Sequence, residues 1–175
     1  MHTTADRRDL AIVDDSWVEG QFRSDYDRLN AYCSERYPNF ALHRGTFEET
    51  LTPEFLETMR VDLPILIWID CDYYTSARTV FERLIPYIPS ACVVYFDEYD
   101  FNHGSRFTGE ARIVYEINKG MFGAHVELVL DRALALHLNR VYRFINEEAE
   151  SRYQRLRPIH DSGQLRRRTN DSPFP

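Results

Sequence analysis

Two short apolar runs that each end in carboxylates constrain this chain more than any other feature. The first is Ile65–Ile69, followed by Asp70–Asp72, and the second is Cys92–Phe96, followed by Asp97 and Glu98. Uninterrupted apolar runs of this length are typical of strands that are buried on both faces of a parallel sheet. Ligands of open α/β sheets bind at the carboxyl edge of the strands. Both acidic ends are therefore expected at a ligand-binding edge.

If these two strands are neighbours, they bring three carboxylates to one point. Adjacent strands lie about 4.8 Å apart, so Asp70, Asp97 and Glu98 are expected to converge. Carboxylates at this spacing repel one another unless a cation or a bound proton relieves them. A hard divalent cation is the simplest ligand for such a site. An Asp at a strand end also commonly ends the strand or caps the next helix, and that structural role is the expectation for Asp72.

The composition is that of one folded domain. The chain has 175 residues, of which 43% are hydrophobic and 14% aromatic, which is enough for a core and excludes a disordered chain. No apolar run approaches the about 20 residues of a transmembrane helix, and the polar opening does not resemble a signal peptide. Three cysteines (Cys33, Cys71 and Cys92) fit neither a disulfide framework nor a zinc site, so a cytoplasmic location is expected. The formal charge of −7 argues against general nucleic-acid binding.

The chain divides into three parts. Residues 1–22 lack a sustained period and are expected to be an irregular lead-in, with Leu10–Val13 as a possible short strand. Residues 23–157 carry the periodic segments and form the folded domain. Residues 158–175 are expected to be a disordered tail, in which the run Arg166–Arg168 is solvated.

Periodicity and capping residues predict alternating helices and strands within that domain. Helices are expected from Asp25 to before Pro38, from Thr52 over Phe55–Met59, from Thr75 or Ser76 to before Pro86, over Gly109–Lys119 and over residues 146–157. Strands are expected at Phe40–His43, Ile65–Asp70, Ala91–Phe96, Val126–Leu130 and Val141–Ile145. The unit that spans residues 65–96 should be parallel and right-handed, and the last two strands should form an antiparallel pair at the sheet edge.

Four segments in order carry a family resemblance. They read G-T-F-E-E-T-L from Gly45, I-D-C-D-Y-Y-T-S-A from Ile69, F-D-E-Y from Phe96 and G-E-A-R from Gly109. Together they resemble the C-terminal half of the macrocin O-methyltransferase family. The resemblance implies a Rossmann-like α/β sheet that uses S-adenosylmethionine, often with a magnesium ion, to methylate sugar hydroxyls of natural products.

The resemblance also implies roles for single residues. Asp70, Asp97 and Glu98 stand where the family holds its metal, with Glu98 in place of the Asp seen in several relatives. Asp70, or a water that it polarises, would take the proton of the substrate hydroxyl. Thr46 and Phe47 match a loop that flanks the adenine of the cofactor, although an ordinary turn with a core Phe explains them equally well. Two further candidates are Glu110, which matches a residue near the substrate but is most simply a helix-dipole partner, and His103, a loop histidine that is either a general base or merely solvated.

The chain departs from the family in one large respect. Its seven glycines include no G-x-G, whereas such folds bind the cofactor on a glycine-rich turn after their first strand. The resemblance therefore implies that the first two strands are missing; in the family's sheet order 3-2-1-4-5-7-6, strand 1 would lie beside Ile65–Asp70. That edge should then be unpaired and apolar, and a second copy or a complementary subunit should cover it. Three explanations stay open on the sequence: a truncated gene product or a mis-assigned start, one half of a split enzyme, or a domain in which Phe40–His43 fills the vacancy.

Three functions remain open on the sequence. The first is an S-adenosylmethionine-dependent, metal-assisted O-methyltransferase-like protein that acts on a hydroxyl of a small molecule but has an incomplete cofactor site. The second is a non-catalytic partner subunit that pairs through its exposed edge strand. The third is a glycosyltransferase, because an apolar strand that ends in D-x-D also holds a metal and a nucleotide diphosphate in many of those enzymes.

Overall fold

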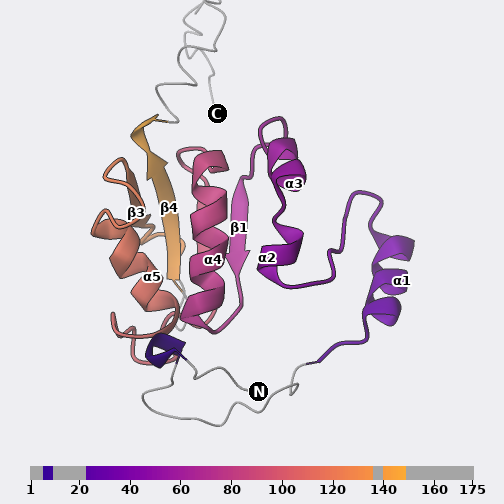
Figure 1. The fold of residues 1–175 in the computed structure, drawn as a ribbon, viewed down its shortest axis with the longest axis horizontal. Coiled ribbons are helices and arrows are strands. Elements are labelled where there is room, and N and C mark those ends of the chain that lie inside the picture. Colours follow the sequence, from indigo (N-terminus) through magenta and orange to yellow (C-terminus); the bar gives the residue numbers. More distant parts are fainter. Residues whose placement is uncertain (1–5, 10–22, 136–139, 149–175) are drawn as a thin grey trace, which may run out of the picture.

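The computed structural model is a mixed α/β structure with one four-stranded sheet (Figure 1). It describes residues 6–9, 23–135 and 140–148. The strands are β1 (Leu66–Ile69), β2 (Val93–Phe96), β3 (Val126–Leu130) and β4 (Arg140–Asn146), in the spatial order β1-β2-β4-β3. None of the helices in these described residues is long and apolar enough to cross a membrane.

The two apolar runs are adjacent parallel strands, as predicted. Ile67 lies opposite Val94 and Ile69 lies opposite Phe96. Helix α4 (Tyr74–Leu84) makes the crossover between the two strands. The predicted antiparallel pair is also confirmed, because β4 runs antiparallel to both β3 and β2. The carboxyl ends of β1 and β2 therefore meet at one edge of the sheet.

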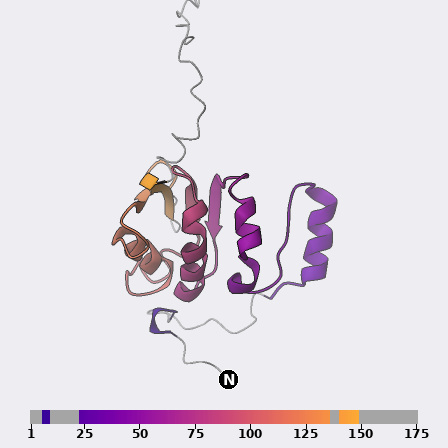
Figure 2. The same ribbon diagram turned by 45° about the horizontal axis from the view of Figure 1, so that its top comes forward.

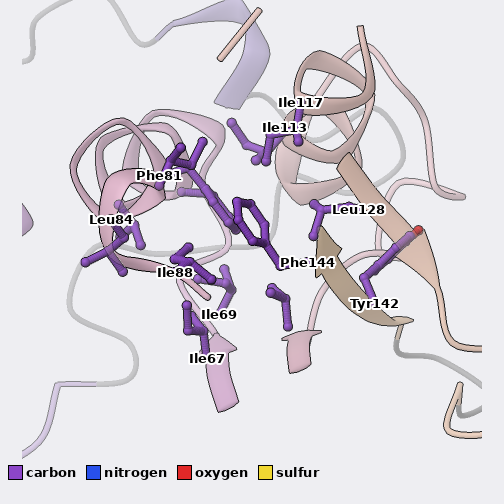
Figure 3. Packing of buried hydrophobic residues seen from close by; sticks show 14 of the residues in the cluster. Ile67, Ile69, Phe81, Leu84, Ile88, Ile113, Ile117, Leu128, Tyr142 and Phe144 are labelled. Atoms are coloured by element: carbon purple, nitrogen blue, oxygen red, sulfur yellow. The ribbon is translucent and has the colours of Figure 1, made fainter. Parts of the chain in front are cut away.

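Helices α4 and α5 (Gly109–Asn118) cover one face of the sheet. The core lies between these helices and the sheet (Figure 3). The residues of this cluster with the most deeply buried side chains include Phe81, Val94, Phe96, Ile113, Ile117 and Phe144. Phe81 of α4 stacks on Phe96 of β2 with ring centroids 5.9 Å apart. Burying each such side chain contributes about 1.5–3 kcal/mol, so this layer fixes α4 and α5 over the ends of β1 and β2.

The other side of β1 is exposed. Leu66 is 50% exposed and Trp68 57% exposed, whereas Ile67 and Ile69 of the same strand are buried. Trp68 rests on Tyr95 of β2, with ring centroids 4.1 Å apart. No strand of the described residues lies on the outer side of β1, since the sheet order begins with it. The prediction of an unpaired apolar edge is confirmed for this part of the chain.

Two of the three helices before β1 begin after their predicted caps, whereas the short helix α2 (Phe47–Thr50) was not predicted. Helix α1 (Tyr26–Arg36) begins after Asp25, whose side chain accepts a hydrogen bond from the Arg28 amide, and helix α3 (Pro53–Thr58) begins after Thr52. Helix α1 buries no side chain and lies at the far end of the molecule from β3 (Figures 1 and 2). Helix α3 joins the core through Leu56, which is 6% exposed.

The predicted strand Phe40–His43 is wrong. The segment is irregular, and its backbone and side chains serve other contacts. The Leu42 carbonyl accepts a hydrogen bond from the Tyr26 hydroxyl at 3.0 Å, and the His43 ring meets the Phe55 ring edge-on at 5.0 Å. The segment therefore links α1 to α3 and does not fill the place beside β1.

The predicted cap of the helix that follows β1 is also wrong. Helix α4 begins at Tyr74, before the predicted caps Thr75 and Ser76, and its N-cap residue Tyr73 makes no capping hydrogen bond with its side chain. Thr108 precedes α5 but likewise gives it no side-chain cap. Its hydroxyl instead donates to the Arg8 carbonyl.

Predictions for the ends of the chain are met only in part. Within the lead-in that was expected to be irregular, Arg7–Asp9 form a 3₁₀ helix, η1. Residues 147 and 148 are helical, as predicted, while Asn146 belongs to β4. The possible strand Leu10–Val13, the rest of the predicted helix 146–157 and the tail 158–175 lie outside the described residues.

Candidate functional site

Parallel pairing of β1 and β2 brings the acidic residues together. The ladder continues one residue beyond the strands, because the Asp97 amide donates to the Ile69 carbonyl at 3.0 Å. Each strand then ends in its own acidic segment at the same edge. Asp70, Asp72 and Glu98 each offer a carboxylate oxygen there, and the three atoms lie within 4.8 Å of one another. Asp70 is exposed, whereas Asp72 and Glu98 are half-buried.

This group differs from the predicted one in one member. Asp70 and Glu98 come together as expected, but the third carboxylate is that of Asp72 and not that of Asp97. The backbone of Asp72 has φ +57°, a left-handed conformation that Asp tolerates better than most residues. Whether any of these four carboxylates is a metal ligand stays a prediction.

Asp97 lies beside the group rather than within it. The Asp97 side chain is close to the group, because a hydrogen bond between it and the Glu98 side chain contributes to the raised pKa of Glu98. A hydrogen bond between Asp97 and the Tyr95 hydroxyl raises the pKa of Tyr95, second to burial. Glu98, on the face toward the helices, is within reach of α5.

Burial and mutual repulsion raise the pKa values in the group. Burial raises the pKa of Glu98 to about 7, with further contributions from the charges of Asp97, Asp72 and Asp70. The pKa of Asp72 is also raised, first by burial and then by Asp70 and Asp97. The Oε2 atom of Glu98 is buried and has no hydrogen-bond partner among the described residues. A proton on Glu98 near neutral pH, or a cation in its place, would satisfy this oxygen.

Glu110 holds the backbone of Glu98 through a hydrogen bond from the helix layer. It lies in the first turn of α5 and is 1% exposed. Its Oε2 atom accepts a hydrogen bond from the Glu98 amide at 3.0 Å, while its Oε1 atom is buried without a partner in the described part of the chain. Burial and the charge of Glu98 raise the pKa of Glu110 to about 8. The predicted substrate contact stays a prediction, and the contact that the structure shows is one that positions Glu98.

The remaining candidates lie outside this group. His103 is exposed in a turn with φ +57°, and its amide donates to the Asp100 carbonyl. Thr46 caps helix α2 (Phe47–Thr50) and shares a capping box with Glu49. The Phe47 ring is 37% exposed. The catalytic role of His103 and the cofactor contacts of Thr46 and Phe47 stay predictions.

The donor set fits a hard divalent cation. Three carboxylates supply the oxygen ligands that Mg²⁺ and Ca²⁺ prefer, and one of them has a buried oxygen without a partner. Cys71 stands between two of these residues, but burial and the surrounding carboxylates raise the pKa of its thiol. Cys71 is therefore held as a neutral thiol, a poor metal ligand.

Sequence reasoning missed two contributors to the site. The only sequence feature that could have indicated Asp72 as a member of the group is its place in the D-x-D pattern. Its left-handed backbone conformation is not predictable from the neighbouring residues. Asp9 bonds to the start of α4 at Thr75, 66 residues along the chain, and no pattern in the sequence predicts that contact.

Comparison of the chain with protein-family models, with curated proteins and with solved structures gives no significant match. The fold and the geometry of the acidic group are therefore the observations that bear on function.

The metal-free protein is expected to lose stability as the pH rises from about 4.5 to about 8. In the folded protein the pKa of Glu98 is about 7 and that of Glu110 about 8, whereas both groups have a pKa near 4.5 in the unfolded chain. Between these values the folded protein binds protons that the unfolded chain has released. Their contribution is thus complete at low pH and is lost as the pH rises through the folded-state values. Chemical denaturation in a chelator, repeated across this interval, measures the effect.

Matched variants identify the groups responsible. Glu98→Gln and Glu110→Gln should each flatten the decline in the free energy of unfolding, while Glu127→Gln, on an exposed position of β3, should keep it. A wild-type profile that is level over the interval would contradict the raised pKa values.

Proposed function

We propose that this chain is a metal-assisted, S-adenosylmethionine-dependent O-methyltransferase-like protein that acts on a hydroxyl of a small molecule. The observation that carries the proposal is the acidic group Asp70, Asp72 and Glu98 at the carboxyl edge of two adjacent parallel strands. The strand order β1-β2-β4-β3, with only β1 and β2 parallel, supports it as well. In this proposal the four strands would correspond to strands 4-5-7-6 of the Rossmann-like order 3-2-1-4-5-7-6.

The acidic residues have distinct parts in this proposal. Asp70, Asp72 and Glu98 would hold the cation, with Asp97 close enough to add to the negative potential. A bound divalent cation supplies Lewis acidity that lowers the pKa of a hydroxyl. Asp70 is the exposed member, so its carboxylate is placed to accept the proton of an incoming hydroxyl. Glu110 would keep Glu98 in place through the backbone hydrogen bond.

The cofactor part of the proposal rests on fewer residues. Thr46 and Phe47 begin α2, where the half-open Phe47 ring can contact a planar group. The sequence has no G-x-G, so a glycine-rich turn for the cofactor would have to come from another polypeptide segment. Methyl transfer would depend mostly on placing the two reactants in line.

Cation binding is the first test. Wild-type protein is expected to bind Mn²⁺ competitively with Mg²⁺, and Asp70→Asn should weaken binding by about tenfold or more because it removes a charged ligand. Titration followed by the paramagnetic signal of free Mn²⁺ measures both affinities. Asp62→Asn, an exposed residue before the other end of β1, is the matched control and should bind like wild type. Equal affinities for Asp70→Asn and wild type would remove the metal from the proposal.

A second candidate function is that of a partner subunit that pairs through β1. The specific observation is the exposure of Ile65 (85%), Leu66 (50%) and Trp68 (57%) along this edge strand, a surface that monomeric proteins normally protect. The two candidates differ in one simple measurement. Thermal stabilisation by S-adenosylmethionine favours the enzyme, whereas self-association without such stabilisation favours the partner subunit.

Self-association through β1 has its own variant test. Leu66→Lys places a charge on the edge and should shift the protein toward monomer in sedimentation-velocity runs over a range of concentrations. Val61→Lys, at a site that is 84% exposed but outside the strand, should leave association unchanged. A wild-type protein that is monomeric at every concentration would exclude a homo-oligomer formed through this edge.

A further inference from the structure

A short N-terminal segment caps helix α4 from a distance. Both carboxylate oxygens of Asp9 are used, since Oδ1 accepts from the Thr75 amide and Oδ2 from the Thr75 hydroxyl, each at 2.8 Å. Helix α4 receives no cap from the side chain of its own N-cap residue, Tyr73. Asp9 thus satisfies an amide in the first turn of α4 that would otherwise lack a partner.

The same segment also joins α4 to α5. The Arg8 guanidinium lies 4.3 Å from the centroid of the Tyr74 ring and donates to its hydroxyl at 2.7 Å. The Arg8 carbonyl accepts from the Thr108 hydroxyl, also at 2.7 Å. The Tyr74 hydroxyl in turn donates to the buried carboxylate of Glu116 in α5. Figure 1 shows η1, in indigo, against the adjacent ends of these two helices.

The starts of α4 and α5 lie close in sequence to residues of the acidic group or to residues that contact it. Thr75 follows Asp72 by three residues, and Thr108 precedes Glu110, which holds the Glu98 amide, by two. The two loops also approach each other closely, because a Cβ on Gly109 would lie 3.7 Å from the Asp72 carbonyl. A segment that binds Thr75 and Thr108 at once therefore fixes the loop that carries Asp72 relative to the residue that supports Glu98.

We propose that Arg8 and Asp9 are positioning residues for the acidic group, and that this segment sets the separation of Asp72 from Glu98 through the starts of α4 and α5. The inference rests on the proposed cation site for its functional consequence. Its structural basis, the four hydrogen bonds of Arg8 and Asp9 to Tyr74, Thr75 and Thr108, is independent of that site.

Two variants of Asp9 separate positioning from charge. Asp9→Ala removes the cap, whereas Asp9→Asn removes the negative charge but keeps an oxygen that can accept from the Thr75 amide, and Asn caps helices about as well as Asp. Asp25→Ala is the matched control, because Asp25 caps α1, a helix that buries no residue. The first readout is Mn²⁺ affinity, measured at a temperature at which every variant is folded. The second is amide hydrogen exchange over residues 70–75 and at Glu98.

The expected results differ among the three variants. Asp9→Ala should weaken Mn²⁺ binding on the order of tenfold, as loss of an outer-shell contact does elsewhere, and should speed exchange at residues 70–75 and at Glu98. Asp9→Asn and Asp25→Ala should stay close to wild type in both readouts.

Each other outcome has a definite meaning. Equal weakening by Asp9→Asn and Asp9→Ala would make the effect one of charge and overturn the inference, as would an Asp9→Ala protein unchanged in both readouts. A wild type that does not bind Mn²⁺ would defeat the proposed function. In that case faster exchange at residues 70–75 in Asp9→Ala alone would still support positioning, and unchanged exchange would overturn it.

Discussion

The parallel pairing of β1 with β2 is the contact on which the rest of this structure depends. It places two acidic strand ends side by side, and the hydrogen bond from Asp97 to Ile69 extends the pairing up to the acidic residues themselves. Carboxylates within 4.8 Å of one another repel by a few kcal/mol at the effective dielectric of a protein surface. A net hydrogen bond contributes only about 0.5–1.5 kcal/mol. Local hydrogen bonds therefore offset only part of this repulsion, and a proton or a cation would relieve the rest.

The contacts around the group oppose that repulsion from two sides. Glu110 holds the end of β2 from the helix layer, and Asp9 holds the loop after β1 through the first turn of α4. Both contacts act on backbone amides, which fixes the chain rather than a side-chain rotamer. Within the described part of the chain, one buried oxygen of Glu98 has no hydrogen-bond partner.

The elements with local signals were predictable from the sequence. The apolar runs identified β1 and β2, and alternation identified β3 and β4, because burial and strand period leave their pattern in neighbouring residues. Asp25 and Thr52 marked helix starts for the same reason. Phe40–His43 has an apolar pattern, but the segment is irregular and the Tyr26 hydroxyl donates to the Leu42 carbonyl.

The site was predictable only where it follows from strand pairing. Asp70 and Glu98 were placed correctly because the ends of parallel strands coincide. Asp72, and not Asp97, completes the group, and this depends on the left-handed backbone conformation of Asp72, which hydrophobic periodicity does not predict.

The two edge strands of the sheet, β3 and β1, differ in how their outward backbone groups are covered. On the β3 edge, the Asn118 side chain bonds both the amide and the carbonyl of Leu128 and so occupies the outward backbone groups. No described residue does this for β1, whose exposed side chains Leu66 and Trp68 lie next to Asp70 in sequence. A polypeptide that paired with β1 would cover these apolar side chains and would also border the exposed carboxylate of Asp70. Pairing at the edge would lower the local dielectric around the acidic group, which strengthens its interaction with a cation and increases the repulsion among its carboxylates when no cation is bound. Cation binding and edge pairing are therefore expected to favour each other, because the cation relieves the repulsion that pairing increases and pairing strengthens the attraction of the carboxylates for the cation.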